Sequence, residues 1–178
     1  MSPRAVLVGL PGTGKTTTGR RLAAKLTVPF ADSDALVEAR AGRSVQDVFA
    51  TDGEAAFRDL EAEVIGVALA GFDGVLALGG GAVLTESTRA ALAASGVPVV
   101  LLRSSLRTLR RRVGDGHGRP LLAGNAATRL SALAAAREPL YRQVATHVVT
   151  TDRRSSSRVA IEIASLLGYE IKRGTVPS

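Results

Sequence analysis

Residues 9–16 read Gly-Leu-Pro-Gly-Thr-Gly-Lys-Thr. This stretch follows a short apolar run at residues 6–8 and opens a segment, residues 15–26, whose apolar side chains recur at helical spacing. A strand that enters a glycine-rich turn of this kind and leaves it as a helix is typical of a P-loop. The glycines let successive backbone N–H groups point toward one chain of phosphates, and the helix N-terminus adds partial positive charge.

The P-loop predicts a site for ATP and Mg²⁺. The ammonium group of Lys15 can reach the β- and γ-phosphates, and the hydroxyl of Thr16 can ligate the metal. We therefore expect a phosphoryl-transfer enzyme with ATP as co-substrate and Mg²⁺ as cofactor. The nucleotide contacts expected in this stretch are Gly12, Thr13, Gly14, Lys15, Thr16 and Thr17.

Strands and helices alternate along the rest of the chain, which predicts an α/β fold with a mostly parallel sheet. Ligands of such sheets bind at the carboxyl ends of the strands. Residues 114–125 are rich in glycine and lack periodicity, so we expect a mobile loop there. Further strands are predicted at residues 30–31, 75–78, 97–102 and 147–150, and helices at 33–40, 44–50, 52–68, 86–94, 105–112, 126–145 and 155–167.

Two aspartates, Asp32 and Asp34, follow the second predicted strand. Residues i and i+2 of an extended segment point the same way, so both carboxylates can face one site. The apolar strand at residues 75–78 ends in glycines and lacks the Asp that often serves the metal of a P-loop. Asp32 is the best candidate for that task, directly or through water, and Asp34 for accepting the proton of a substrate hydroxyl. Capping of the next helix by Ser33 or Asp34 is an alternative that can coexist with these roles.

Arginines and glycines supply candidate contacts to an acidic substrate. Arg58 and Glu61 lie three apart on one predicted helix, so Glu61 can hold Arg58 for a bidentate grip on a carboxylate. A routine surface ion pair is the alternative. The triple glycine at residues 79–81 allows close backbone approach to a ligand. Arg119, in the 114–125 loop, can close over a transferring phosphate, and Arg137 lies on the following helix. Each lone arginine could instead be a solvated surface group.

Composition narrows the class of protein. The chain has 178 residues, of which 46% are hydrophobic, which suits one compact domain. It contains no cysteine, which excludes disulfides and thiolate metal sites, and no apolar run approaches the roughly 18 residues of a membrane span. We expect a cytoplasmic monomer with no membrane partner. The net charge is +7, but the arginines are scattered and only two Tyr and four Phe could stack on bases, so we expect no nucleic-acid partner.

Taken together, the motifs resemble those of shikimate kinases. The resemblance covers the chain from Val6 to about Leu167, and the joint order and spacing of its motifs are specific. The matching motifs are the P-loop, Asp-Ser-Asp at 32–34, Asp-Gly-Glu-x-x-Phe-Arg at 52–58 with Glu61, Leu-Gly-Gly-Gly at 78–81, Arg-Pro-Leu-Leu at 119–122 and Arg-x-Pro-Leu-Tyr at 137–141.

The resemblance implies a fold and an activity. The fold is a three-layer αβα P-loop fold, related to adenylate kinase, with a five-stranded parallel sheet. Residues 1–168 would form one kinase domain with a shikimate-binding subdomain at 33–61 and a lid at 113–125, followed by a polar tail at 169–178. The activity is ATP-dependent phosphorylation of the 3-hydroxyl of shikimate, in the pathway to aromatic amino acids.

It also implies a role for each matching residue. Lys15 and Arg119 would stabilise the transferring phosphoryl group, Asp34 would receive the shikimate hydroxyls, and Thr16 and Asp32 would serve Mg²⁺. Arg112 and Arg153 resemble contacts to the adenine side of ATP. The expected contacts to shikimate are Asp34, Arg58, Gly79, Gly80, Gly81 and Arg137.

Two rival classes remain open from the sequence. One is a P-loop kinase for another small acceptor, such as gluconate or a nucleotide. The other is an ATP-binding regulatory or interaction module without catalysis. Asp34 together with Arg58 favours a polyhydroxy acid as acceptor, and the presence of Lys15, both aspartates and Arg119 favours catalysis.

Overall fold

A computed structural model describes residues 1–113 and 126–170. Its centre is a parallel five-stranded sheet, as the resemblance implies, and its strand order is β2-β3-β1-β4-β5. The strands are β1 (Ala5–Val8), β2 (Phe30–Asp32), β3 (Val75–Ala77), β4 (Val99–Arg103) and β5 (His147–Thr150). Strand β4 begins two residues later than predicted, because Pro98 has no N–H to donate to a neighbouring strand.

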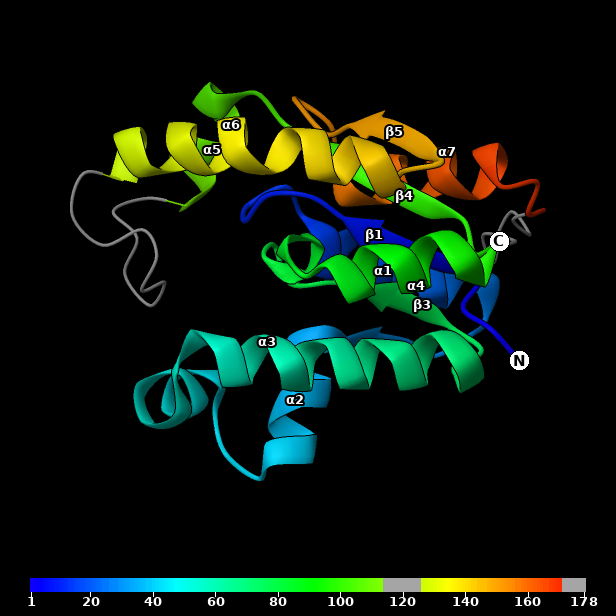
Figure 1. Ribbon diagram of the computed structural model, residues 1–178. Helices are drawn as coiled ribbons and strands as arrows, with labels where there is room; N and C mark the ends of the chain where they lie inside the picture. Colours follow the sequence, from blue (N-terminus) through cyan, green and yellow to red (C-terminus); the bar gives the residue numbers. More distant parts are fainter. Residues whose placement is uncertain (114–125, 171–178) are drawn as a thin grey trace.

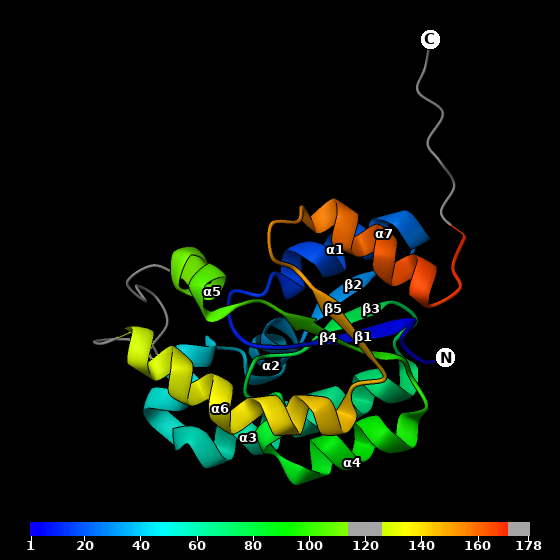
Figure 2. The same cartoon turned by 90° about the horizontal axis from the view of Figure 1, so that it is seen from above.

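Helices cover both faces of the sheet, which confirms the three-layer architecture. Figure 2 shows α1 (Lys15–Leu26) and α7 (Ser156–Leu166) on one side, and α3 (Val45–Gly71), α4 (Glu86–Ser95) and α6 (Ala126–Val144) on the other. Helix α5 (Leu106–Val113) follows β4, and a short 3₁₀ helix, η1 (Ala82–Leu84), follows β3. All the strands are parallel, so their carboxyl ends meet at one edge of the sheet.

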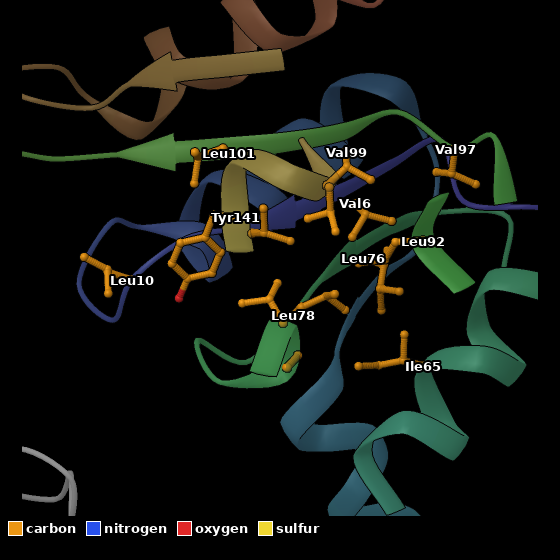
Figure 3. Packing of buried hydrophobic residues seen from close by; sticks show 14 of the residues in the cluster. Val6, Leu10, Ile65, Leu76, Leu78, Leu92, Val97, Val99, Leu101 and Tyr141 are labelled. Carbon is orange, nitrogen blue, oxygen red and sulfur yellow. The ribbon is translucent and has the colours of Figure 1, made fainter. Parts of the chain in front are cut away.

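The side chains of each strand alternate between two apolar clusters, one under each helix layer. In β1, Val6 and Val8 pack toward α3, α4 and α6, whereas Ala5 and Leu7 pack toward α1 and α7. Figure 3 shows the first of these clusters, in which the ring of Tyr141 from α6 lies among aliphatic side chains of the sheet. With few aromatic residues in the chain, Val, Leu and Ala build most of this core.

Helix α2 (Ser33–Ala41) and the first turns of α3 project from one end of the molecule (Figure 1). The two helices predicted at 44–50 and 52–68 are both present within α3, but the chain changes direction at Gly53 and not at residue 51. Ser44 caps the first helix, and Gly53 has non-helical backbone angles, with φ 85° and ψ 173°. Glycine tolerates this left-handed conformation, so the chain turns there without an intervening loop. A small separate cluster of Val37, Val48, Phe57 and Val64 closes this end.

The last described residues extend the ordered fold slightly into the segment that we expected to be a polar tail. Tyr169 packs against the cluster beneath α1 and α7, and its hydroxyl donates to the backbone oxygen of Arg4 at 3.2 Å. In the part of the chain that the structure describes, no helix combines the length and the apolar character needed to cross a bilayer.

Candidate active site

The P-loop has the backbone form that its glycines predict. Gly12 and Gly14 have φ values of 85° and 90°, and α1 begins at Lys15. The ammonium of Lys15 folds back over the loop and donates to the backbone oxygens of Gly9 at 2.8 Å and Leu10 at 3.1 Å. Thr13 is buried and donates to the same Leu10 oxygen. These internal contacts shape the loop.

Thr16 and Asp32 meet at the carboxyl edge of the sheet. The Thr16 hydroxyl, in the first turn of α1, donates to the Asp32 carboxylate at the end of β2 at 2.8 Å. Hard oxygen ligands of this kind suit Mg²⁺, which proteins usually hold through one or two carboxylates plus the substrate's phosphates. The described residues contain no cluster of three His, Cys, Asp or Glu side chains that could hold a metal by itself. The pair fits a metal that arrives with a nucleotide.

The predicted alternative that Ser33 or Asp34 caps α2 was wrong. Asp32 is the N-cap, and its carboxylate accepts from the backbone N–H of Asp34 at 3.2 Å. Ser33 is instead fully buried, and its hydroxyl accepts from the backbone N–H of Gly79 at 2.8 Å. Sequence reasoning missed this role of Ser33, which ties the Asp-Ser-Asp segment to the triple glycine. Its position between two predicted site residues was the only available signal.

Asp34 faces the triple glycine from α2. A Cβ atom built on Gly79 would lie 2.9 Å from Oδ1 of Asp34, so the backbone approaches the carboxylate closely. Although the side chain is open to solvent on one side, desolvation by the surrounding protein raises the pKa of the Asp34 carboxyl. The nearby Asp32 raises that pKa further, while Lys15 and Arg58 act in the opposite direction. A carboxyl perturbed by both burial and charge is typical of a functional site.

Arg58 and Glu61 form a buried pair, so the alternative of a routine surface ion pair was wrong. Nη1 of Arg58 lies 2.6 Å from Oε2 of Glu61, and the two side chains are 13% and 1% exposed. The guanidinium also lies over the rings of Phe57 and Phe49, at 5.0 and 6.0 Å from their centroids. Burial raises the pKa of the Glu61 carboxyl, and the Arg58 guanidinium lowers it. The ion pair with Glu61 therefore holds the Arg58 guanidinium beside the triple glycine.

Gly81 touches the guanidinium of Arg58 so closely that a side chain there would displace it. A Cβ atom at Gly81 would lie 2.2 Å from Nη2 and 2.6 Å from Cζ of Arg58. The Gly81 backbone, at φ −97° and ψ −6°, suits alanine, and the displaced group is the end of a flexible side chain. Gly81→Ala should therefore fold while moving Arg58 off its position.

We expect Gly81→Ala to raise the KM for the acidic acceptor about tenfold, the cost of misplacing one charge-assisted contact, with little change in the KM for ATP. Steady-state kinetics with each substrate varied in turn measures both constants. Gly66→Ala is the matched control, because a Cβ atom there meets nothing within 4 Å. Equal acceptor KM values in the two variants would contradict the close packing of Arg58 on Gly81.

Arg137, on α6, also approaches the triple glycine. Its side chain is buried, and a Cβ atom on Gly80 would lie 3.4 Å from Nη1 of Arg137. The positive charge of Arg137 also lowers the pKa of the buried Glu61 carboxyl. The three glycines thus approach three predicted substrate contacts, with Asp34 beside Gly79, Arg137 beside Gly80 and Arg58 beside Gly81.

Of the remaining residues predicted to bind the nucleotide, only Arg112 contacts the P-loop in the part of the chain that the structure describes. Arg112, at the end of α5, donates to the backbone oxygen of Gly12 at 3.3 Å and to that of Thr151 at 3.0 Å, so it joins the P-loop. Arg153 is exposed in the β5–α7 loop, with φ 53°, and no contact among the described residues links its side chain to the site. Thr17 is exposed in the first turn of α1. Arg119 lies outside the described residues.

A P-loop with its lysine and threonine, two carboxylates, the partly buried Arg58 and the buried Arg137 therefore meet at one edge of a parallel sheet. This combination defines a P-loop kinase for a small acceptor that carries both a hydroxyl and an anionic group. A family model described as shikimate kinase matches residues 11–167. The chain belongs to the shikimate kinase family.

Known proteins agree with this assignment. The chain is 54% identical over 168 residues to a shikimate kinase of Mycobacterium tuberculosis, covering 94% of each chain. It is 52% identical over 167 residues to a shikimate kinase of Salinispora arenicola, covering 94% of this chain and 99% of the relative. Among solved structures, a shikimate kinase of Acinetobacter baumannii in complex with shikimate aligns with a TM-score of 0.88 at 34% identity, covering 94% of this chain and 93% of that one.

The same fold also occurs in a kinase of a different name. A gluconokinase of Sinorhizobium meliloti aligns with a TM-score of 0.62 at 22% identity, covering 94% of this chain and 92% of that one. This likeness shows a shared fold alone.

Proposed function

We propose that this kinase transfers the γ-phosphoryl group of ATP to the 3-hydroxyl of shikimate through the residues gathered at the carboxyl edge of its sheet. ATP is the co-substrate and shikimate the acceptor. The observation that carries the proposal is the arrangement around the triple glycine. Gly79 lies beside the Asp34 carboxylate, Gly80 beside Arg137 and Gly81 beside Arg58. Hydrogen bonds of Gly79 with Ser33 and of Thr16 with Asp32 connect this turn to the P-loop helix.

On the donor side, the chain supplies charge and backbone donors for the phosphates. Residues 12–17 would surround the phosphate chain, with the Lys15 ammonium turning from the backbone oxygens that it now contacts to the transferring group. Arg112 would bind the nucleotide beside the loop that it already contacts, with Arg153 on the adenine side. Phosphoryl transfer depends mainly on such positioning and charge stabilisation.

Mg²⁺ would be held by the Thr16 hydroxyl and, directly or through water, by the Asp32 carboxylate. The 2.8 Å hydrogen bond between these two groups supports the assignment, because it brings both oxygens to one point beside the P-loop. When bound, the ion supplies positive charge for the phosphate oxygens.

On the acceptor side, Asp34 would accept the hydrogen bond of the reacting hydroxyl and take its proton. Arg58 and Arg137 would hold the carboxylate of shikimate, with Gly79, Gly80 and Gly81 close to its ring. One buried and one partly buried guanidinium group beside one carboxylate base suit an acid with several hydroxyls. Residues 33–61 would act as the substrate-binding subdomain, which the small cluster of α2 and α3 supports.

Residues 113–125 would act as the lid, with Arg119 reaching the transferring phosphoryl group. Closure would exclude water from the site and so limit hydrolysis of ATP. Of this segment, the structure describes only the last residue of α5. The support is the resemblance of the Arg-Pro-Leu-Leu stretch at 119–122 to the family motif.

The raised pKa of Asp34 predicts how activity depends on pH. Only the ionised carboxylate can take the proton, so kcat/KM for shikimate should fall as the pH falls, approaching about tenfold per pH unit. The midpoint should lie above the ordinary range for an Asp side chain. A pH profile of kcat/KM with ATP saturating measures it. A constant kcat/KM down to the ordinary pKa of Asp would contradict the role given to Asp34.

An ADP-release assay coupled to a second enzyme tests the function against its rivals. We expect rapid ADP release with MgATP and shikimate, and only slow release with gluconate or with no acceptor. Equal release with gluconate would identify the rival kinase. Release that no acceptor stimulates would favour an ATP-binding module without transfer.

We further propose that the enzyme works as a cytoplasmic monomer with no nucleic-acid partner. A chain without cysteine and with ATP as co-substrate suits a reducing, nucleotide-rich compartment. Its site is built from a single chain, and its basic surface contains few aromatic residues for stacking. Sedimentation analysis of the purified enzyme tests the monomer.

A further inference from the structure

Ser33 has a buried hydroxyl for which the proposed reaction has no role. It is the first residue of α2, lies between the two aspartates of the site, and is 0% exposed. Alanine is a better helix former than serine and would fill nearly the same space. Neither helix formation nor apolar packing therefore explains a hydroxyl at this position.

The Ser33 hydroxyl continues the hydrogen-bond ladder between β2 and β3 after β2 has ended. The backbone N–H of Val75, at the start of β3, donates to the backbone oxygen of Pro29 at 2.9 Å. The N–H of Gly79, beyond the carboxyl end of β3, donates to the Ser33 hydroxyl at 2.8 Å, and the sequence separation is the same in both bonds. In a regular parallel ladder the acceptor at this step would be the backbone oxygen of residue 33. Because the chain has already turned into α2, the side chain supplies the acceptor instead.

This bond holds the proposed base against the glycine turn. Asp34 follows Ser33 directly, and its Oδ1 would lie 2.9 Å from a Cβ atom on Gly79. Two neighbouring side chains of α2 thus meet the same glycine, one through a hydrogen bond and one through close approach. Removal of the hydroxyl would leave the Gly79 N–H without its acceptor and would free the start of α2 to shift.

The glycine turn also borders the arginines that are proposed to grip the acceptor. The two glycines after Gly79 lie beside Arg137 and Arg58. The bond between Ser33 and Gly79 therefore joins the segment that carries the base to the segment that adjoins the carboxylate grip. An acceptor held by its carboxylate reacts only if the base stands at the right distance from that grip, and small displacements from such a geometry are costly.

We propose that Ser33 is a positioning residue for the transfer step, because its hydroxyl sets the place of Asp34 relative to the glycine turn. The proposal rests on the proposed function, in which Asp34 takes the proton of the reacting hydroxyl. Ser33 makes no contact with either substrate and moves no proton. Its loss should therefore act on kcat through Asp34, separately from any loss of stability.

We expect Ser33→Ala to lower kcat for shikimate about tenfold, since a slightly misplaced base loses part of its effect, and to leave the KM values for both substrates within about threefold. Ser95→Ala is the matched control. The Ser95 hydroxyl also accepts from a backbone N–H, that of Val97 at 3.2 Å, but near the amino end of β4 and away from the site. The control should keep wild-type kinetics, and a wild-type kcat in Ser33→Ala would overturn the proposal.

A second variant guards against loss of folding. Thermal melts report the stability of each variant, and rates are compared below every melting temperature. If Ser33→Ala melts too low for the assay, Ser33→Cys takes its place, because it fills a similar volume and its sulfur accepts only weakly. Its kcat should again fall with both KM values nearly unchanged, and an unchanged kcat would overturn the proposal in the same way.

A double substitution distinguishes positioning of the base from a general loosening of the site. In an Asp34→Asn background, Ser33→Ala should change kcat by less than about twofold, since the residue through which it acts is already inactive. Transfer from radiolabelled ATP measures these slow rates. A full tenfold effect in that background would overturn the proposal. The proposed function would still stand if the wild-type enzyme phosphorylates shikimate and Asp34→Asn alone lowers kcat.

Discussion

Asp34→Asn should lower kcat for shikimate phosphorylation by about 10²–10⁴-fold, the usual contribution of a general base. Asparagine has nearly the same shape and can still interact with a hydroxyl, but it cannot take the proton. The affinity for ATP should change little, because the P-loop contacts do not include Asp34. Steady-state rates with both substrates saturating, together with titration of a fluorescent ATP analogue, separate the two effects.

The same substitution should not cost stability. Since the folded state raises the pKa of Asp34, it binds the proton more tightly than the unfolded chain does, and the residue's contribution to stability falls as the pH rises through this range. At neutral pH, Asp34→Asn should melt at the wild-type temperature or above it. Asp59→Asn, at an exposed position on α3, is the control and should keep wild-type kinetics. Near-wild-type turnover in Asp34→Asn would remove Asp34 as the base.

Arg137→Ala should raise the KM for shikimate about 100-fold while leaving the KM for ATP within a few-fold, because it removes a buried partner of the carboxylate. Arg137→Lys keeps the charge but loses the planar fork, so we expect a smaller rise of about tenfold. Initial rates with each substrate varied separately provide both constants. Arg111→Ala, on the exposed side of α5, is the control for loss of one arginine.

Arg58→Ala should act in the same direction but should also lower the melting temperature. The substitution leaves the carboxylate of Glu61, which is 1% exposed, without its partner. Arg137 therefore gives the cleaner test of the carboxylate grip. If Arg137→Ala raised the KM values for ATP and shikimate equally, its role at the acceptor would be contradicted.

Local sequence rules predict much of this fold because its elements begin and end at residues with strong preferences. The P-loop glycines, the helix predicted from residue 44 and the apolar strand predicted at 97–102 each correspond to structure that is found. The predicted break at residue 51 precedes the observed kink at Gly53, because the sequence does not specify the backbone angles that this glycine adopts. Val48 and Phe57, on either side of the kink, belong to one apolar cluster that stabilises this arrangement.

The site was less predictable where contacts join segments far apart in the sequence. Spacing placed Glu61 beside Arg58, but it could not show that the pair is buried beneath the triple glycine. It could not find the contact of Ser33 with Gly79 or that of Tyr141 with Gly80, which cross 46 and 61 residues. The strand order brings these residues together, and the periodicity within a single helix or strand does not predict that order.

The most direct test of the central claim compares shikimate with its methyl ester as acceptor. The ester keeps every ring hydroxyl and loses only the charge that Arg58 and Arg137 are proposed to grip. With wild-type enzyme and MgATP, we predict that ³¹P NMR shows phosphate on the 3-hydroxyl of shikimate, and that kcat/KM for the ester is at least about 100-fold lower. Equal kcat/KM for the acid and the ester, or phosphate on another hydroxyl, would contradict the account.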